Sequence, residues 1–273
     1  MIPAKFDYEV ASSVDDAVRL LGESGDAKLL AGGHSLLPLM RLRFARPSLL
    51  VDIGRLKELS YVKDAGDKVA IGALTRHHDL ATSKVLRDQC VIVASTAAQV
   101  GDPQVRHRGT IGGSVAHGDP ASDLPTVLLA LEAEILVQGT GGTRTIPASD
   151  FFTGFLETAL TPQDVLTEIR VPKLGGSGAV YVKFNRRAQD WATVAVAAVA
   201  SNGGANVALT NMGSTPLRAT AVEQALASGA NATAAAEKAA EGTSPPSDTN
   251  GSADFRRHLA RVLTKRALEQ ALG

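Results

Sequence analysis

Two short stretches of this chain place paired glycines beside hydroxyl side chains. The first is Ala31-Gly32-Gly33-His34-Ser35, directly after the apolar run 28–30, and the second is Thr110-Ile111-Gly112-Gly113-Ser114. We interpret each as a Gly-Gly turn that follows an apolar strand. Paired glycines let a backbone approach another group closely and adopt dihedral angles that other residues avoid. One such pair is typical of a tight turn, but any fold proposed for this chain has to explain two.

Successive backbone N–H groups in turns of this kind form concavities that bind anions, and Ser or Thr hydroxyls add donors. A diphosphate held between two loops needs several neutral donors and little side-chain bulk. From the residues alone, the two stretches are consistent either with a shared phosphate ligand or with two plain turns. In the first case, the carboxylate of Asp123 is a candidate acceptor for hydrogen bonds from sugar hydroxyls.

The overall charge and composition exclude several classes of partner. Lys plus Arg and Asp plus Glu number 28 each, so no global field attracts nucleic acid or a membrane surface. Aromatic residues make up only 4% of the chain, too few for a set of base-stacking platforms. With 44% hydrophobic residues over 273 positions, the chain is long enough for two domains or one large one.

The single cysteine, Cys90, limits what the chain binds by itself. It excludes an intrachain disulfide, a Cys-ligated zinc site and an iron–sulfur cluster held by this chain alone. The start of the chain carries Asp7 and Glu9 where a signal peptide would be apolar. The longest uncharged segment, 191–217, is interrupted by Asn and Gly residues. We therefore expect a cytoplasmic protein without an integral membrane segment. Any attachment to the inner face of the membrane would come through the complex that the protein joins.

The pattern of apolar residues divides the chain into three parts, 1–55, 56–173 and 178–273. In the first, Ser13 and Asp16 predict the start of a helix between strands at 6–10, 28–30 and 48–53, which gives a βαββ-like unit. The second opens with a hairpin, YVKDAGDKVAIGA, whose turn is 65–67. It continues with a helix over 86–100 and strands at 134–139 and 165–172.

The segment LGGSG (174–178) predicts a linker, and the third part follows it. Three β-rich runs, AVYVKF, WATVAVAAVAS and ANVALTNMG, precede helices expected at 219–228, 231–241 and 254–271. The loop TSPPSDTNGS separates the last two helices, because its Pro-Pro and Asn-Gly pairs cannot continue one. Strands followed by helices indicate an α+β class for this domain.

Several common motifs are absent from the sequence. It contains no Walker phosphate-binding loop, no HExxH zinc motif and no GxSxG nucleophile motif. No GxGxxG opens a helix after a strand, so a dinucleotide would be bound outside the Rossmann scheme.

The sequence resembles the flavin-binding medium subunits of the molybdenum hydroxylases. The resemblance rests on AGGHSLLPLMRLR and TIGGSVAHGDPASDLP, and extends over VLTEIRVP, KFNRRAQDWATVAVA and NMGSTPLRA. The nearest likeness is to the medium subunit of aerobic carbon monoxide dehydrogenase, and the flavin domain of xanthine dehydrogenase is related. This family implies a two-part FAD-binding domain of the vanillyl-alcohol-oxidase type, followed by a small C-terminal domain with a three-stranded antiparallel sheet and helices.

The resemblance also implies which residues bind FAD. The two glycine stretches would wrap the diphosphate and ribityl chain, and Asp123 would bind sugar or ribityl hydroxyls. Leu166 and Lys183 correspond to contacts near the isoalloxazine ring, Val100 to a contact with the adenine, and Trp191 to a residue near the flavin in some relatives. Without the resemblance, Leu166, Val100 and Trp191 are consistent with ordinary core positions. The cofactor-binding set is Ala31, Gly32, Gly33, His34, Ser35, Leu36, Val100, Thr110, Ile111, Gly112, Gly113, Ser114, Asp123, Leu166, Lys183 and Trp191.

Other polar residues near these stretches have open roles. We expect His77-His78 to be a surface pair, because nothing at metal-ligand spacing joins it. His107 and His117 flank the second glycine stretch, where we expect bonding to the backbone rather than a proton relay to flavin. Arg106 and Arg108 are consistent with neutralising phosphate or with pairing to a partner subunit.

By resemblance, the leading functional hypothesis is an electron-transfer subunit. A large subunit with a molybdenum cofactor and a small subunit with two [2Fe-2S] clusters would deliver electrons to FAD here, within a dimer of heterotrimers. The external acceptor would be quinone, cytochrome or NAD, and carbon monoxide is the favoured substrate over purine, nicotinate or aromatic compounds. A self-contained FAD oxidase and a nucleotide-binding regulatory or scaffold protein remain alternatives. No catalytic acid, base or nucleophile is assigned within the chain.

Overall fold

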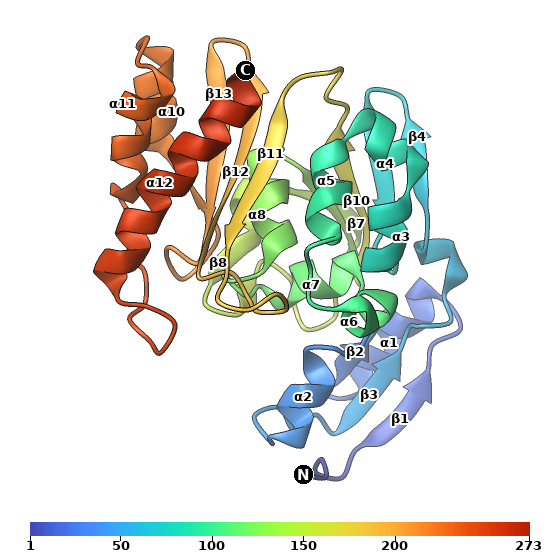
Figure 1. Cartoon of the computed structure of the whole chain (residues 1–273). Helices are drawn as coiled ribbons and strands as arrows, with labels where there is room; N and C mark the ends of the chain where they lie inside the picture. The colour runs from blue at the N-terminus through green and yellow to red at the C-terminus, as the bar shows by residue number, and fades with distance from the viewer.

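The computed structural model describes residues 1–273, and Figure 1 shows the small N-terminal sheet below the main body. This sheet is parallel, with strand order β1-β3-β2. Its elements are β1 (Asp7–Val10), α1 (Val14–Glu23), β2 (Lys28–Leu30), α2 (Leu36–Arg41) and β3 (Leu49–Asp52). The predicted start of α1 is confirmed, because Ser13 Oγ accepts a hydrogen bond from the N–H of Asp16 at 3.1 Å.

The predicted βαββ unit did not include α2, which the structure contains as a six-residue helix directly after the first glycine stretch. Its sequence contains Pro38, which usually argues against a helix. Here the proline lies in the first turn, where the backbone N–H that it lacks has no helical partner to lose.

The middle part of the chain forms a five-stranded antiparallel sheet with order β4-β5-β10-β6-β7. The apolar residues of β5, β6 and β10 pack against α5 and α8 in the largest core of the molecule. The elements are η1 (Lys57–Leu59), β4 (Val62–Ala65), β5 (Lys68–Gly72), α3 (His77–Thr82), α4 (Lys84–Gln89), α5 (Val91–Ala97), α6 (Pro103–Arg108), α7 (Ile111–His117), α8 (Asp123–Ala130), β6 (Glu134–Gly139), β7 (Gly142–Pro147), α9 (Ala148–Phe151), β8 (Phe152–Gly154), β9 (Glu157–Thr158) and β10 (Val165–Pro172). The predicted hairpin is confirmed as β4–β5, with Gly66 at φ +82° in its turn.

Two helical regions differ from the prediction. The single helix expected over 86–100 is divided at Cys90, whose φ of −153° and ψ of 64° interrupt it between α4 and α5. The second glycine stretch is not a turn after an apolar strand, because it follows α6 and forms the first turns of α7. Thr110 caps this helix, its Oγ1 accepting from the N–H of Gly113 at 3.1 Å.

The C-terminal part contains an antiparallel sheet with order β11-β12-β13-β14. Its elements are β11 (Ala179–Phe184), β12 (Val194–Ser201), β13 (Gly204–Thr210), β14 (Leu217–Arg218), α10 (Thr220–Ala227), α11 (Ala232–Ala236), η2 (Glu237–Ala240) and α12 (Ala253–Leu272). The three predicted strands are present, and the two-residue β14 is a fourth that the prediction missed. Two residues paired beside a longer strand leave no periodic pattern in the sequence.

β12 lies in the middle of this domain and is buried on both faces. Val194, Val196 and Ala198 pack toward α12 in the C-terminal core, whereas Ala195 and Ala197 pack toward the core shared with the middle part. Figure 1 shows α12 lying across the strands on the side away from α5 and α8. The sheet is therefore sandwiched between the two sets of helices, which explains its continuous apolar sequence.

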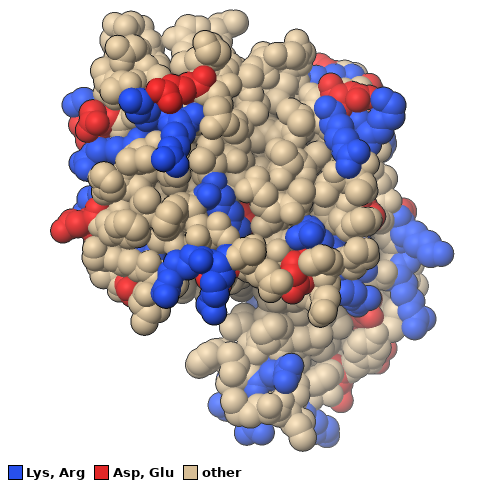
Figure 2. Space-filling model, in the orientation of Figure 1, with Lys and Arg blue, Asp and Glu red and all other residues tan.

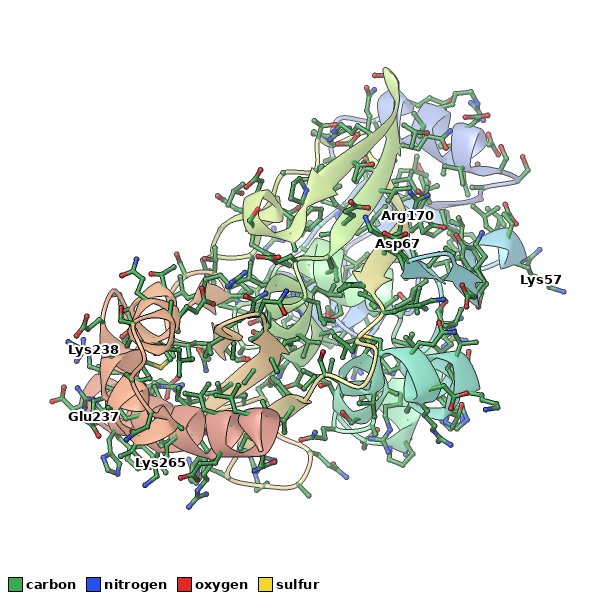
Figure 3. All side chains as sticks on the ribbon, turned by 90° about the horizontal axis from the view of Figure 1, so that it is seen from above. Lys57, Asp67, Arg170, Glu237, Lys238 and Lys265 are labelled. Atoms are coloured by element: carbon green, nitrogen blue, oxygen red, sulfur yellow. The ribbon has the colours of Figure 1, made fainter.

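The segment predicted as a linker contains Gly175 and Gly176 at φ +56° and +90°. Gly178 then lies against the backbone carbonyl of Ala271 at the end of α12, where any Cβ would collide. Charged side chains of both signs are spread over the face shown in Figure 2, consistent with the balanced composition. Figure 3 shows Glu237, Lys238 and Lys265 projecting from the C-terminal helices. None of the helices combines the length and the apolar character that a membrane-spanning helix needs.

Candidate functional site

A cavity of about 830 Å³ lies where the three parts of the chain meet. This is a volume typical of pockets for sizeable ligands. The lining draws on both glycine stretches, on β10 and on the first strand of the C-terminal sheet. Among the predicted cofactor-binding residues, those that line it are Ala31, Gly32, Gly33, His34, Ser35, Leu36, Val100, Thr110, Gly112, Gly113, Ser114, Asp123, Leu166, Lys183 and Trp191.

Ile111 is the predicted residue that does not line the cavity. Its side chain is fully buried in the large core, on the side of α7 that faces away from the cavity. The reason is the helix itself: successive residues of a helix point in different directions, so a five-residue stretch cannot present all its side chains to one ligand.

The first glycine stretch forms an open set of backbone donors. The N–H groups from Gly32 to Leu36 make no hydrogen bond within the chain, and Ser35, at the N-cap of α2, does not use its hydroxyl for capping. Gly33 has φ +76°, in the left-handed region that glycine adopts readily. Consecutive free N–H groups around such a residue form an anion-binding nest. The stretch therefore fits the diphosphate of a dinucleotide.

The second glycine stretch contributes differently, because its donors are already in use. The N–H groups of Ile111 and Gly112 donate to the carbonyl oxygens of Thr75 and Ala73 at 3.1 and 2.9 Å. A Cβ on Gly112 would lie 2.6 Å from the Cβ of Ala73. What this stretch offers is a backbone surface without side-chain bulk, which lets a ligand approach closely.

The first stretch touches the two residues that precede the second one. A Cβ on Gly32 would collide with the carbonyl oxygen of Arg108 and would lie 2.9 Å from the Cα of Gly109. Glycine is therefore required at position 32 by packing, independently of any ligand. The contact packs the first glycine stretch against the end of α6.

A buried ion pair forms another part of the cavity wall. Lys183 Nζ lies 2.9 Å from Asp123 Oδ2, and their side chains are only 5% and 7% exposed. Tyr181 donates its hydroxyl to Asp123 Oδ1 at 2.7 Å. Burial raises the pKa of the Asp123 carboxyl, and the charge and hydrogen bond of Lys183 oppose that shift. A carboxylate with one bond on each oxygen keeps lone pairs for a ligand hydroxyl.

This ion pair belongs to a chain of buried polar groups that crosses between two parts of the molecule. The Tyr181 hydroxyl also lies 3.1 Å from Thr210 Oγ1, which donates to Thr126 Oγ1 at 2.8 Å. Tyr181 and Thr210 come from β11 and β13, whereas Asp123 and Thr126 come from α8. The network therefore fixes the C-terminal sheet against the middle part beside the cavity.

The apolar lining residues differ in exposure. Leu166 is 4% exposed and belongs both to the large core and to the cavity wall, whereas Val100 is half-buried. Trp191 is 57% exposed, so it is not an ordinary core residue. It follows β11 in a loop that borders the cavity, where an indole can cover a bound ring.

Two contributions to the cavity have no signal in the local sequence. One is the β8–β9 hairpin, whose Thr153, Leu156 and Thr158 line the cavity although the stretch carries no motif. The other is His77, which is 4% exposed and lines the cavity, so the prediction of a surface pair is wrong for this residue. Its burial depends on Gly109, more than thirty positions away, which local sequence does not reveal.

The remaining polar candidates have defined positions. His107 Nδ1 contacts the carbonyl oxygen of Pro103 at 2.7 Å, so this histidine bonds the backbone as expected. His117 lines the cavity, and burial lowers its pKa. Arg106 donates to the carbonyl oxygens of Val100 and Gly101, which braces the turn before α6.

Two family matches together cover nearly the whole chain. Residues 4–174 match the FAD binding domain in molybdopterin dehydrogenase, and residues 179–271 match the CO dehydrogenase flavoprotein C-terminal domain. The chain belongs to the FAD-binding medium subunits of the molybdenum hydroxylases. This medium subunit is a flavoprotein component of an oxidoreductase complex of the carbon monoxide dehydrogenase type, and its α+β fold is that of the family.

Individual relatives match over their full lengths. The carbon monoxide dehydrogenase medium chain of Hydrogenophaga pseudoflava is 43% identical, covering 99% of this medium subunit and 98% of the relative. Subunit alpha of the 6-hydroxypseudooxynicotine dehydrogenase complex of Paenarthrobacter nicotinovorans is 40% identical, covering 100% and 96%. A solved structure of carbon monoxide dehydrogenase from Hydrogenophaga pseudoflava superposes with a TM-score of 0.96 at 45% identity, covering 100% and 99%.

Proposed function

We propose that this medium subunit carries FAD in the cavity and acts as the electron-transfer subunit of a molybdenum-containing dehydrogenase, with carbon monoxide as the favoured substrate of the complex. The observation that carries the proposal is the set of free backbone N–H groups from Gly32 to Leu36 at one end of a cavity of about 830 Å³. FAD supplies a centre that accepts electrons one at a time and releases two to an acceptor.

The residues of the chain then have separate tasks in holding the cofactor. The first glycine stretch and Ser35 bind the diphosphate, and the second stretch closes over it without side-chain bulk. Asp123, held by Lys183 and Tyr181, accepts hydrogen bonds from ribityl or sugar hydroxyls. Leu166 and Trp191 line the space for the isoalloxazine ring. The protein thereby positions and tunes the ring.

The partners in this proposal are a large subunit with a molybdenum cofactor and a small subunit with two [2Fe-2S] clusters, assembled as a dimer of heterotrimers. Cys90, the one cysteine, is buried and provides no cluster ligand set. Electrons from the clusters reach FAD here and leave to quinone, cytochrome or NAD. Support comes from relatives that are named as chains or subunits of such dehydrogenases.

The substrate has one specific alternative. The relative named for 6-hydroxypseudooxynicotine is 40% identical over the whole chain, against 43% for the carbon monoxide relative. A heteroaromatic substrate is therefore the second candidate, since the large subunit that would bind either one is a separate chain.

The test is to purify the chain from its native host with its associated polypeptides. We expect an absorption spectrum of flavin plus iron–sulfur clusters, two co-purifying chains, and reduction of the complex by carbon monoxide. Reduction by an N-heteroaromatic compound instead would select the alternative substrate. Flavin without partner chains would indicate a self-contained oxidase, and a protein that neither contains nor binds FAD would refute the proposal.

A further inference from the structure

One buried histidine beside the cavity remains without a role. His77, the first residue of α3, lines the cavity although it is only 4% exposed. Its backbone N–H donates to the carbonyl oxygen of Gly109 at 3.0 Å. This bond ties the histidine to the residue directly before the second glycine stretch.

His77 packs against Gly109, the residue that contacts the first glycine stretch. A Cβ on Gly109 would lie 2.8 Å from Cδ2 and 3.1 Å from Nε2 of the imidazole. On the other side, a Cβ on Gly32 would lie 2.9 Å from the Cα of Gly109. The imidazole ring therefore packs against Gly109, and Gly109 packs against Gly32. Only glycine fits at positions 109 and 32. A ligand bound along the first stretch lies close to this column.

The imidazole keeps unused hydrogen-bonding capacity. Nδ1 is sealed from solvent and has no partner, although buried polar groups in proteins are nearly always bonded. Nε2 also makes no hydrogen bond within the chain. Nε2 is not among the sealed atoms, so it is the ring nitrogen that a ligand in the cavity can reach. A group from outside the chain is the remaining candidate partner for Nε2.

The charges around the ring favour an anion. Burial is the main cause that lowers the pKa of His77 to about 4, and the charges of His34, Arg106 and Arg76 act in the same direction. At neutral pH the ring is therefore uncharged in the chain alone. The titratable or charged groups on the elements around it are His34 of the first stretch, Arg76, His78 and Asp79 at α3, and Arg106, His107 and Arg108 on α6.

We propose that His77 is a ligand of the FAD diphosphate: Nδ1 keeps the proton of the neutral ring, and Nε2 takes up a proton from solvent as the cofactor binds and donates it in a hydrogen bond to a phosphate oxygen. The inference rests on the proposed function as an FAD carrier. An opposite charge within hydrogen-bonding range raises the pKa of a cationic acid by about 1 to 3. Beginning from about 4, the imidazole then titrates near the mildly acidic range.

The experiment uses the complex purified from its host and depleted of flavin. FAD is titrated calorimetrically at about pH 6 and about pH 8, in two buffers with different ionisation enthalpies, which reports affinity and proton uptake together. We expect wild-type protein to take up protons at the lower pH and to bind FAD more tightly there. His77→Phe should weaken FAD binding about tenfold to a hundredfold and abolish the uptake.

Two further variants separate hydrogen-bond donation by His77 from its proton uptake. His77→Gln keeps a donor but cannot take a proton, so it should retain most of the affinity and lose the uptake. His34→Asn, in the first stretch, should retain the uptake. If His77→Gln keeps wild-type affinity and wild-type uptake, or if the uptake disappears only in His34→Asn, the inference is wrong. His77→Gln decides the matter even if His77→Phe does not fold. A wild-type complex that binds no FAD at all would instead refute the proposed function.

Discussion

The buried pair of Lys183 and Asp123 allows a quantitative test of the site. Replacing Lys183 with Met keeps most of the side-chain volume but leaves the Asp123 carboxylate with Tyr181 as its remaining side-chain partner. Removal of one partner from a buried ion pair costs about 3 to 5 kcal/mol, because an uncompensated charge stays in a low-dielectric interior. At about 95% burial of Lys183, little solvent screening reduces this figure.

The pH dependence of this effect has a definite sign. In Lys183→Met the pKa of Asp123 rises further above its unfolded value, since burial already raises it and the opposing cation is gone. The penalty is then present in full at alkaline pH and is relieved as the pH falls and the carboxyl becomes protonated. Guanidinium unfolding followed by circular dichroism, at about pH 8 and about pH 5, measures both limits.

Two controls make the result decisive. Lys84→Met removes an ion pair with Asp88 whose side chains are 87% and 55% exposed, and it should cost less than about 1 kcal/mol. The double variant Asp123→Asn/Lys183→Met should be more stable than the sum of the single variants predicts. If Lys183→Met costs no more than Lys84→Met, or the two changes add, the pair does not stabilise this wall as argued.

Three further predictions concern other sites. Gly113→Val should abolish FAD retention in a binding titration, whereas Gly25→Ala, whose Cβ would meet nothing within 4 Å, should leave retention intact; full flavin occupancy in Gly113→Val would contradict this. Burial raises the pKa of Cys90 to about 12, so a thiol reagent at about pH 8 should label it only after unfolding; labelling of the native chain would contradict this. Because the pKa of His77 falls from 6.5 to about 4 on folding, the FAD-free chain should lose up to about 3 kcal/mol of stability as pH falls through that interval. His77→Phe should lack this loss in denaturant titrations, and an unchanged pH profile would refute the assignment.

The features predicted from sequence are those with a strong local signal. The capped start of α1, the β4–β5 hairpin and the first glycine stretch after β2 all depend on residues close together in the chain. α7 was missed because two glycines cost a helix about 1 kcal/mol each relative to alanine. The cap from Thr110 and the packing of Gly112 against Ala73 outweigh that cost, and neither contact is visible locally.

The cavity depends on longer-range contacts, which limits what a sequence can reveal. The β8–β9 hairpin reaches it through pairing of only a few residues, with no motif in either strand. The pair of Asp123 and Lys183 joins α8 to a strand sixty positions later, so the ionic partner of Asp123 follows only from the fold. The resemblance to a family identified both residues individually but not the bond between them.

The arrangement of the cavity wall has a consequence for how the subunit is made. Gly32 is synthesised early, but Lys183 and Trp191 leave the ribosome only when most of the chain is complete, and β12 and β13 must follow before the sheet behind them is paired. Domains generally fold in the order in which they are synthesised. A nascent chain therefore has the free N–H groups of the first glycine stretch before it has a closed cavity, and on the proposed function cofactor insertion becomes a late event that reports completed synthesis.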